Sequence, residues 1–399
     1  MDPAERRAAR ADLKALLLCA VAALVAACGP AKSPGTTGHD KQIVVLGHAG
    51  PLTGPIAHQG KDDENGVALA LEEANASAPV IGGKRITFRM LSEDDQGDPK
   101  IGTLVAQKFV DARVAAVIGH LNSGVSIPAS EIYARAGIPM ITGSATNPVL
   151  TERGLPLVFR VVGRDDQQGP AIAAYIAQDF KAKRVALVDD KTAYGEGLAN
   201  EVDKSLRAAG VAIAGRERVS DKETDFKAVL TRIKQKDVDA VFHGGMDSTG
   251  GLLVKQAREL GVKAHFAFGD GACTDEMTQL AGPAGEGLAC SQAGIPASAA
   301  KPGFLKAFDA KFGPTKLYAP FFYDATNVVI AAMKLADSTD PAKFGPRMHD
   351  VVLEGATGRI AFDAKGDRVN PDMTILVMKG GQIVPVATFG AQGLKAVMP

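Results

Sequence analysis

The sequence predicts an α/β protein of two lobes, each built on a parallel sheet with helices on both faces. Strand-like apolar runs alternate with helix-like runs through most of the chain, and a second cycle of this alternation begins near residue 163. The 399 residues, 46% of them hydrophobic, are enough for two domains with full cores.

The N-terminus carries a leader that does not belong to the fold. Basic side chains precede an apolar run from Ala15 to Ala27, which is shorter than the roughly 20 residues of a membrane span. We therefore predict a signal peptide over residues 1–27. The sequence "VAAC" at its end resembles the bacterial lipobox, which implies that Cys28 is diacylated and becomes the first mature residue. Cleavage of a plain signal peptide nearby is the alternative.

A polar segment follows the leader. Residues 28–41 are rich in Gly, Pro, Ser and Thr and show no apolar periodicity, so we predict a lipidated flexible tether. The folded body then begins near Gln42. Export would place the remaining cysteines, Cys273 and Cys290, in an oxidising compartment, and we predict that they form a disulfide. Two buried, unpaired thiols are the alternative.

Strands and helices follow one another in order along the body. The strand-like runs are short, apolar and mostly end in Gly or Asp, whereas the helix-like runs are longer and amphipathic. The predicted strands lie at 42–50, 85–95, 114–120, 137–143, 184–190, 238–245 and 265–270, and the predicted helices at 63–76, 99–112, 163–180, 195–210 and 320–337.

Small polar residues follow two successive strands, where parallel sheets bind ligands. Ser123 falls at the start of a helix after the strand at 114–120, where unpaired N–H groups and the helix dipole attract an anion. The next strand ends in Ser144 and Thr146. A carboxylate fits this arrangement, and ordinary helix caps are the alternative.

The balance of charge and the motifs exclude several classes of protein. Lys plus Arg and Asp plus Glu number 45 each, so no basic field is available for nucleic acid. No nucleophile elbow and no zinc-type spacing of histidines occurs. The acidic run from Glu93 to Asp98 indicates a solvated turn and a helix N-cap and not a metal site. We expect no catalytic residues, no cofactor and no metal.

Several motifs in the right order carry a family resemblance. "VIGHLNSGVSIPASEIYARAGIPMITGSATNP", with "GPLTGPIAHQG", "RDDQQGPAIAAYI" and "DDKTAYGEGLA", resembles the bacterial leucine/isoleucine/valine-binding proteins of branched-chain amino acid ABC transporters. The resemblance spans about residues 42 to 390. It implies a type I periplasmic-binding fold of two Rossmann-like lobes joined by a three-segment hinge, a Venus-flytrap. The implied lobes are 42–162 with 292–356, and 163–291 with 357–399.

The same resemblance implies the groups that hold the ligand backbone. Ser123 and Thr146 would bind its carboxylate through hydroxyl and backbone N–H groups. The carbonyl of Ser144 would accept a hydrogen bond from its ammonium. Asp270 would pair with that ammonium where the family has glutamate. A helix cap or turn residue is the alternative for Asp270.

Four further positions would line the cleft. The resemblance implies that Tyr194 and Tyr323 keep the family's tyrosines, whereas Gln59 and Met246 replace aromatic residues. The side-chain pocket should therefore differ from the family's in volume and polarity. The alternatives are a core position for Tyr194 and interlobe packing for Tyr323.

The implied function is that of an extracytoplasmic substrate-binding lipoprotein of an ABC importer. It would capture an L-amino acid, branched-chain or related, and deliver it to a membrane permease and its ATPase subunits. We expect a monomer anchored in the cell envelope through Cys28. The alternatives are a ligand sensor of the same fold and a receptor for amides or aromatic acids.

Overall fold

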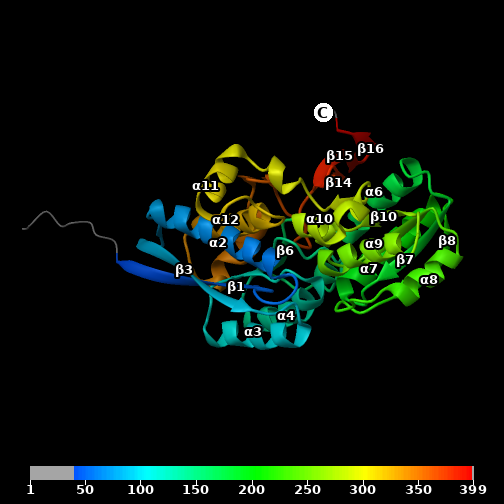
Figure 1. Cartoon of the computed structure of the whole chain (residues 1–399). Helices are drawn as coiled ribbons and strands as arrows, with labels where there is room; N and C mark the ends of the chain where they lie inside the picture. Colours follow the sequence, from blue (N-terminus) through cyan, green and yellow to red (C-terminus); the bar gives the residue numbers. More distant parts are fainter. Residues whose placement is uncertain (1–39, 398–399) are drawn as a thin grey trace, which may run out of the picture. The chain divides into compact units, whose positions relative to one another are not determined.

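The computed structural model describes residues 40–397 (Figure 1). From Lys41 onward the chain forms one compact unit that contains two sheets. The predicted signal peptide, Cys28 and nearly all of the predicted tether lie outside the described residues. No helix within residues 40–397 is long and apolar enough to cross a membrane.

The first sheet has six strands in the order β2-β3-β1-β4-β5-β6. Its strands are β1 (Lys41–Gly50), β2 (Val80–Ile81), β3 (Lys84–Asp94), β4 (Val117–Gly119), β5 (Met140–Thr142) and β6 (Val158–Arg160). All neighbours pair in parallel except the short β2, which is antiparallel to β3. The carboxyl ends of β1, β4 and β5 therefore meet at one edge.

Helices cover this sheet on both faces. They are α2 (Ala57–Ala76), α3 (Pro99–Asp111), α4 (Ser123–Ala136), α5 (Val149–Glu152), α11 (Pro302–Phe312), α12 (Ala319–Leu335) and α13 (Pro341–Phe344). Figure 1 shows α12 beside α2 and α3 beside α4, and both pairs are in contact. Asp98 caps α3 by accepting hydrogen bonds from the N–H groups of Lys100 and Ile101. We call this sheet and these helices the first lobe.

The second sheet has eight strands in the order β16-β15-β14-β11-β10-β9-β7-β8. Its strands are β7 (Arg184–Asp189), β8 (Ala212–Arg218), β9 (Ala240–Gly244), β10 (His265–Phe268), β11 (Ala289–Gln292), β14 (Met373–Lys379), β15 (Gln382–Gly390) and β16 (Gly393–Ala396). Its helices are α6 (Asp165–Gln178), α7 (Ala193–Ala208), α8 (Lys227–Gln235), α9 (Asp247–Glu259) and α10 (Asp275–Ala281). We call this set the second lobe.

One edge of the second sheet departs from the predicted parallel order. Strand β15 is antiparallel to its neighbours β14 and β16, and β14 is antiparallel to β11. The turn between β14 and β15 is Gly380-Gly381, with φ of 58° and 79°. Left-handed glycines at both central positions form the tight hairpin turn that suits antiparallel strands.

The chain passes between the two sheets three times, after β6, β11 and β13. The remaining elements are the ribbon of β12 (Leu353–Gly355) and β13 (Gly358–Ile360), and 3₁₀ turns at Asp270–Ala272, Gly282–Gly285, Ala297–Ala299 and Pro346–Asp350. The crossings touch, since the N–H of Gly163 donates to the carbonyl of Ala293 at 2.8 Å. The prediction of a two-lobed α/β fold is confirmed, while the exact lobe boundaries stay a prediction.

Candidate functional site

The first lobe gathers the predicted carboxylate-binding groups at the ends of β4 and β5. Ser123 is the first residue of α4, and its Oγ accepts a hydrogen bond from the N–H of Asn147 at 3.2 Å. The hydroxyl of Ser144 donates to the carbonyl of Leu121 at 2.9 Å. Thr146 is fully buried, yet its hydroxyl makes no hydrogen bond of ordinary geometry within residues 40–397. This hydroxyl and the α4 N-terminus are available for a ligand.

Asp270 lies at the start of the turn after β10 and is fully buried. Its carboxylate accepts hydrogen bonds from the hydroxyls of Tyr194 at 2.9 Å and Tyr318 at 2.7 Å. Burial raises the pKa of Asp270, although these two hydroxyls oppose the shift. No lysine, arginine or histidine in the described part of the chain forms an ion pair with it. The carboxylate thus has oriented neutral donors and lacks a counter-charge.

Tyr194 belongs to this polar cluster and not only to the core. It lies in the first turn of α7, and its hydroxyl also accepts a hydrogen bond from the N–H of Gly271 at 3.0 Å. Gln168 supports the same turn, because its Oε1 accepts from the N–H of Asp270 at 3.0 Å and from the hydroxyl of Ser291 at 2.9 Å. The turn that carries Asp270 is therefore held from several sides.

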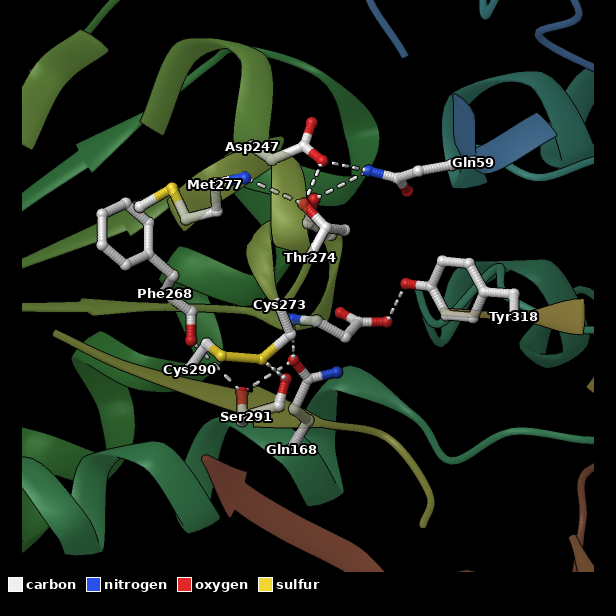
Figure 2. The surroundings of a disulfide bond; sticks show 12 residues. Gln59, Gln168, Asp247, Phe268, Cys273, Thr274, Met277, Cys290, Ser291 and Tyr318 are labelled. Carbon is white, nitrogen blue, oxygen red and sulfur yellow. Dashed lines mark hydrogen bonds between the residues drawn. A yellow bond between two sulfur atoms is a disulfide. The ribbon is translucent and has the colours of Figure 1, made fainter. Parts of the chain in front are cut away.

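A disulfide adds to this support. Cys273 and Cys290 are bonded, with their Cα atoms 5.7 Å apart. Figure 2 shows the bond beside Ser291 and Gln168. It ties the turn after β10 to the neighbouring strand β11. Closing a loop of this length restricts the unfolded chain and typically stabilises a protein by about 3 kcal/mol.

Tyr323 does not lie with the other predicted residues, which corrects the sequence-based prediction. It is half-buried, its hydroxyl donates to Glu73 of α2 at 2.5 Å, and its ring contacts Phe304 at a centroid distance of 5.0 Å. Tyr318, five residues earlier, reaches Asp270 instead. Five residues rotate a helix by about 140° beyond a full turn, so the two side chains point to different sides of α12.

Asp62 explains why Tyr318 occupies its position. Its carboxylate accepts hydrogen bonds from four consecutive backbone N–H groups, those of residues 316 to 319, at 2.8 to 3.0 Å. These contacts fix the entry into α12, where Tyr318 is the N-cap residue. Sequence analysis missed Tyr318, although a tyrosine at the start of a helix near the cleft is a better candidate than one in its second turn.

Gln59 and Met246 lie at the boundary between the lobes. Gln59 is fully buried, and its Nε2 donates to the Asp247 carboxylate at 3.0 Å and to the carbonyl of Gly271 at 3.1 Å. Met246 is the half-buried N-cap residue of α9. A cavity of about 520 Å³ beside Met246 is lined from both lobes, by Asn122 and Ile56 and by Tyr194 and Met246, whereas Gln59 and Asp270 are not among its lining residues. That volume suits a small ligand.

Further contacts hold the two lobes together. His58 of the first lobe pairs with Asp247 of the second at 2.7 Å. Within the second lobe, Thr274 donates to the same carboxylate at 2.5 Å and so orients it (Figure 2 shows the Thr274 contact). The amide of Asn147 donates to the carbonyl of Ala193 at 2.6 Å. With the bond from Tyr318 to Asp270, these contacts give the arrangement of a closed cleft.

Asp165 is a second residue that sequence analysis did not single out. It opens α6, is fully buried, and neither carboxyl oxygen forms a hydrogen bond of ordinary geometry with any described residue. Burial raises the pKa of Asp165 to about 8. The nearby Thr146 hydroxyl lowers this pKa, whereas the charge of Asp270 raises it further. Arg160 also opposes the shift, but its guanidinium pairs with Asp367 at 2.6 Å. The motif "RDDQQGP" was a signal that pointed to this position.

The chain resembles known binding proteins over most of its length. A sequence profile described as periplasmic binding protein matches residues 43–382. The Leu/Ile/Val-binding protein homolog 1 of Brucella abortus (strain 2308) is 39% identical over 326 residues, which cover 81% of this chain and 87% of that protein. A leucine-, isoleucine-, valine-, threonine- and alanine-binding protein of Pseudomonas aeruginosa is 36% identical over 329 residues, covering 82% and 87%.

Solved structures show the same fold. The leucine-binding protein LivK of Thermotoga maritima superposes with a TM-score of 0.81 at 27% sequence identity, covering 88% of this chain and 99% of that one. Its two-lobed architecture is that of a type I periplasmic binding protein.

Proposed function

Because this chain belongs to the periplasmic binding protein family, we propose that it captures an L-amino acid, branched-chain or related, between its two lobes for an ABC importer. The protein would then deliver this ligand to a membrane permease driven by ATPase subunits. Closure of the lobes around the ligand would raise the population of the form that docks on the permease.

The surroundings of Asp270 carry this proposal. The carboxylate is buried, oriented by two tyrosine hydroxyls, and has no cationic partner in the described range. A buried charge is costly unless it is paired, so a ligand ammonium is the group that this position accommodates best. The hydroxyls of Tyr194 and Tyr318 each donate to one oxygen of the carboxylate and so fix its orientation.

The opposite end of the ligand would meet the first lobe. The hydroxyl of Thr146, which lies near the Asp165 carboxyl group, and the N-terminus of α4 at Ser123 suit a carboxylate. Asp165 lies near both Thr146 and Asp270. Its N–H donates to the carbonyl of Thr146 at 3.0 Å, and the charge of Asp270 raises the pKa of its carboxyl group. An α-amino acid carries the ammonium and carboxylate that these two ends would bind.

The cellular part of the proposal rests on the leader. We propose that Cys28 is lipidated after cleavage of residues 1–27 and that residues 28–41 tether a monomeric body in the cell envelope. The proposed first lobe comprises 42–162 with 292–356, and the second 163–291 with 357–399. Co-purification of an ABC permease with the full-length protein supports this role, whereas a kinase or regulator as the captured partner would indicate a sensor.

Calorimetric titration tests the binding function. Mature protein lacking Cys28 is unfolded without reductant, refolded to remove bound ligand, and titrated with each common L-amino acid. We expect tight binding of at least one of them. Replacing Asp270 by Ala should weaken it by about 30-fold to several-thousand-fold, because one partner of a buried charge pair is lost.

A matched variant controls for loss of an aspartate in the same segment. Asp275 opens α10 a few residues later, and its side chain is 68% exposed. Asp275→Ala should bind as the wild type does, because its 3.9 Å pair with Lys316 is solvent-exposed and such pairs contribute little. Binding of only compounds without an α-ammonium, such as aromatic acids, would contradict the proposed ligand class.

A further inference from the structure

Two side chains on one face of α2 carry acceptor oxygens without partners. Gln59 and Asp63 are four residues apart, so they lie one above the other on the helix. Both are fully buried. The Oε1 of Gln59 and both carboxyl oxygens of Asp63 have no hydrogen-bond partner within residues 40–397.

This face of α2 points toward the second lobe. Figure 2 shows Gln59 reaching from α2 toward Asp247, and its Nε2 also donates to the carbonyl of Gly271, the residue after Asp270. The orphan Oε1 of the same amide therefore lies at the boundary of the lobes. It is close to the position proposed for the ligand ammonium.

Asp63 lies one turn further along this face and near Tyr318. Burial raises the pKa of Tyr318 far above its ordinary value, and the charges of Asp270 and Asp63 add to the shift. Tyr318 itself bonds Asp270 at 2.7 Å. Gln59 and Tyr318 thus lie next to Asp270 on the first-lobe side, and the unpaired carboxyl group of Asp63 lies on the same helical face as Gln59 and near enough to Tyr318 to influence its pKa.

The neighbouring Asp62 differs from Asp63, because the carboxylate of Asp62 is fully hydrogen-bonded and that of Asp63 has no partner among the described residues. Asp62 uses its carboxylate on four backbone N–H groups and has nothing left to offer a ligand. Asp63 has no such donors, and no described lysine, arginine or histidine pairs with it. Burial, with the charges of Asp62 and Asp95, raises its pKa well above the ordinary value.

An aliphatic ligand side chain would leave these oxygens unsatisfied. Buried polar groups are costly without hydrogen bonds, and most of them in folded proteins have a partner. Leucine, isoleucine and valine offer no donor beyond their ammonium group. A side chain that ends in N–H groups would supply donors to Gln59 and Asp63 together.

We propose that the bound amino acid has a side chain ending in N–H donors, an amide or an ammonium, and that Gln59 and Asp63 recognise this group. The inference rests on the proposed amino-acid-binding function. It makes Gln59 and Asp63 residues that determine specificity, while Asp270 serves the α-ammonium common to all amino acids.

Calorimetry of the refolded wild type tests this inference with L-glutamine, L-asparagine, L-ornithine and L-lysine against L-leucine and L-valine. We expect the best donor-bearing ligand to bind at least about tenfold more tightly than L-leucine, the effect of one hydrogen bond to a buried polar or charged group. Tighter binding of glutamine or asparagine identifies the amide, and tighter binding of ornithine or lysine the ammonium.

Variants assign the preference to the two residues. Gln59→Leu and Asp63→Asn should each reduce the advantage over L-leucine by about tenfold or more, and Asp63→Asn should affect an ammonium ligand more than an amide ligand. Glu72→Gln is the control, because it replaces a carboxylate by an amide as Asp63→Asn does. Glu72 lies on the exposed face of α2, with a side chain 59% exposed. It should leave every affinity unchanged.

The outcomes separate the inference from the proposed function. If L-leucine or L-valine binds the wild type at least as tightly as every donor-bearing amino acid, the inference is wrong while the amino-acid-binding function stands. If no amino acid binds, both are wrong. Thermal unfolding checks each variant, and if Asp63→Asn fails to fold, the wild-type ligand series and Gln59→Leu still decide the question.

Discussion

Three buried carboxyl groups give the cleft its chemical character. Asp63, Asp165 and Asp270 are fully buried, and none forms an ion pair within the described range. Burial is the first cause that raises the pKa of each of them. A cationic ligand group would favour their charged forms, so these carboxyl groups would interact most favourably with a ligand that carries an ammonium.

Tyr318 supplies a residue-scale prediction. Tyr318→Phe keeps the ring but removes the hydroxyl that donates to Asp270 at 2.7 Å. Loss of one hydrogen bond to a charged group should weaken amino-acid binding by about 1.5 to 3 kcal/mol, as measured by calorimetry. Tyr323→Phe is the matched control, because its hydroxyl interacts with Glu73 and Asn327 and not with Asp270, and the variant should bind normally. An equal loss of affinity in both variants would show that Tyr323 also contributes to ligand binding.

The positions of residues that follow a strand could be predicted from the sequence, because the order of the strands determines where they lie. Ser123, Ser144 and Thr146 follow adjacent parallel strands, so the sheet necessarily brings them to one edge. Asp270 likewise follows a strand of the second sheet. Tyr318 and Tyr323 could not be separated in this way, because the choice depends on the rotation of α12, which the bonds to Asp62 set. The roles of all these residues as ligand contacts stay predictions.

At the scale of elements, α2 combines structural support and recognition. The sequence predicts this helix from residue 63, whereas it begins at Ala57. Its N-cap residue, Ile56, makes no side-chain capping bond, so the ordinary start signal is missing. The extra turn places Gln59 on the same helical face as Asp63, a relation that could not be read while Gln59 was assigned to a loop.

The first turns of α2 also fix the start of α12. Asp62→Ala would leave four N–H groups of residues 316–319 without their acceptor. We expect the free energy of unfolding in urea to fall by about 2 to 3 kcal/mol and amino-acid binding to weaken through displacement of Tyr318.

Asp98→Ala is the control for this change. It removes the N-cap of α3, which should cost about 1 kcal/mol of stability and leave affinity unchanged, because neither Asp98 nor its two N–H donors are among the residues proposed to contact the ligand. If Asp62→Ala retained full affinity, Asp62 would have no part in positioning Tyr318.

The contact between α2 and α9 makes binding depend on pH. Burial tends to lower the pKa of His58, but Asp247, with Glu276 and Asp62, raises it overall in the closed form. In an open form the imidazole would keep its ordinary pKa. The stabilisation of the closed form is therefore fully present below that ordinary value and is lost as the pH rises through the raised value.

Calorimetry at two pH values checks this expectation. Between about pH 6 and pH 8 the affinity of the wild type should fall more than that of His58→Gln, by up to about tenfold for each unit of pKa shift. His265→Gln, which alters an exposed histidine at the start of β10, should follow the wild type. Identical pH dependence in the wild type and His58→Gln would show that this contact does not contribute to closure.

At the scale of the whole molecule, the alternating pattern and the family motifs were enough to predict two α/β lobes. The antiparallel edge of β14 to β16 was not predicted, because its signal is a local Gly-Gly turn and not a feature of the alternation. The contacts across the cleft could not be predicted either. They are made by His58, Gln59 and Tyr318 with residues far apart in the sequence, and they depend on how the lobes close.

We propose that Asp270 binds the α-ammonium of an amino acid held between the lobes. The most direct test compares, by calorimetry on the refolded protein, the best-binding L-amino acid with the 2-hydroxy acid that has the same side chain. The hydroxy acid keeps the carboxylate and side chain but lacks the positive charge. We expect it to bind at least about 30-fold more weakly. Equal affinity for the two compounds would contradict the account.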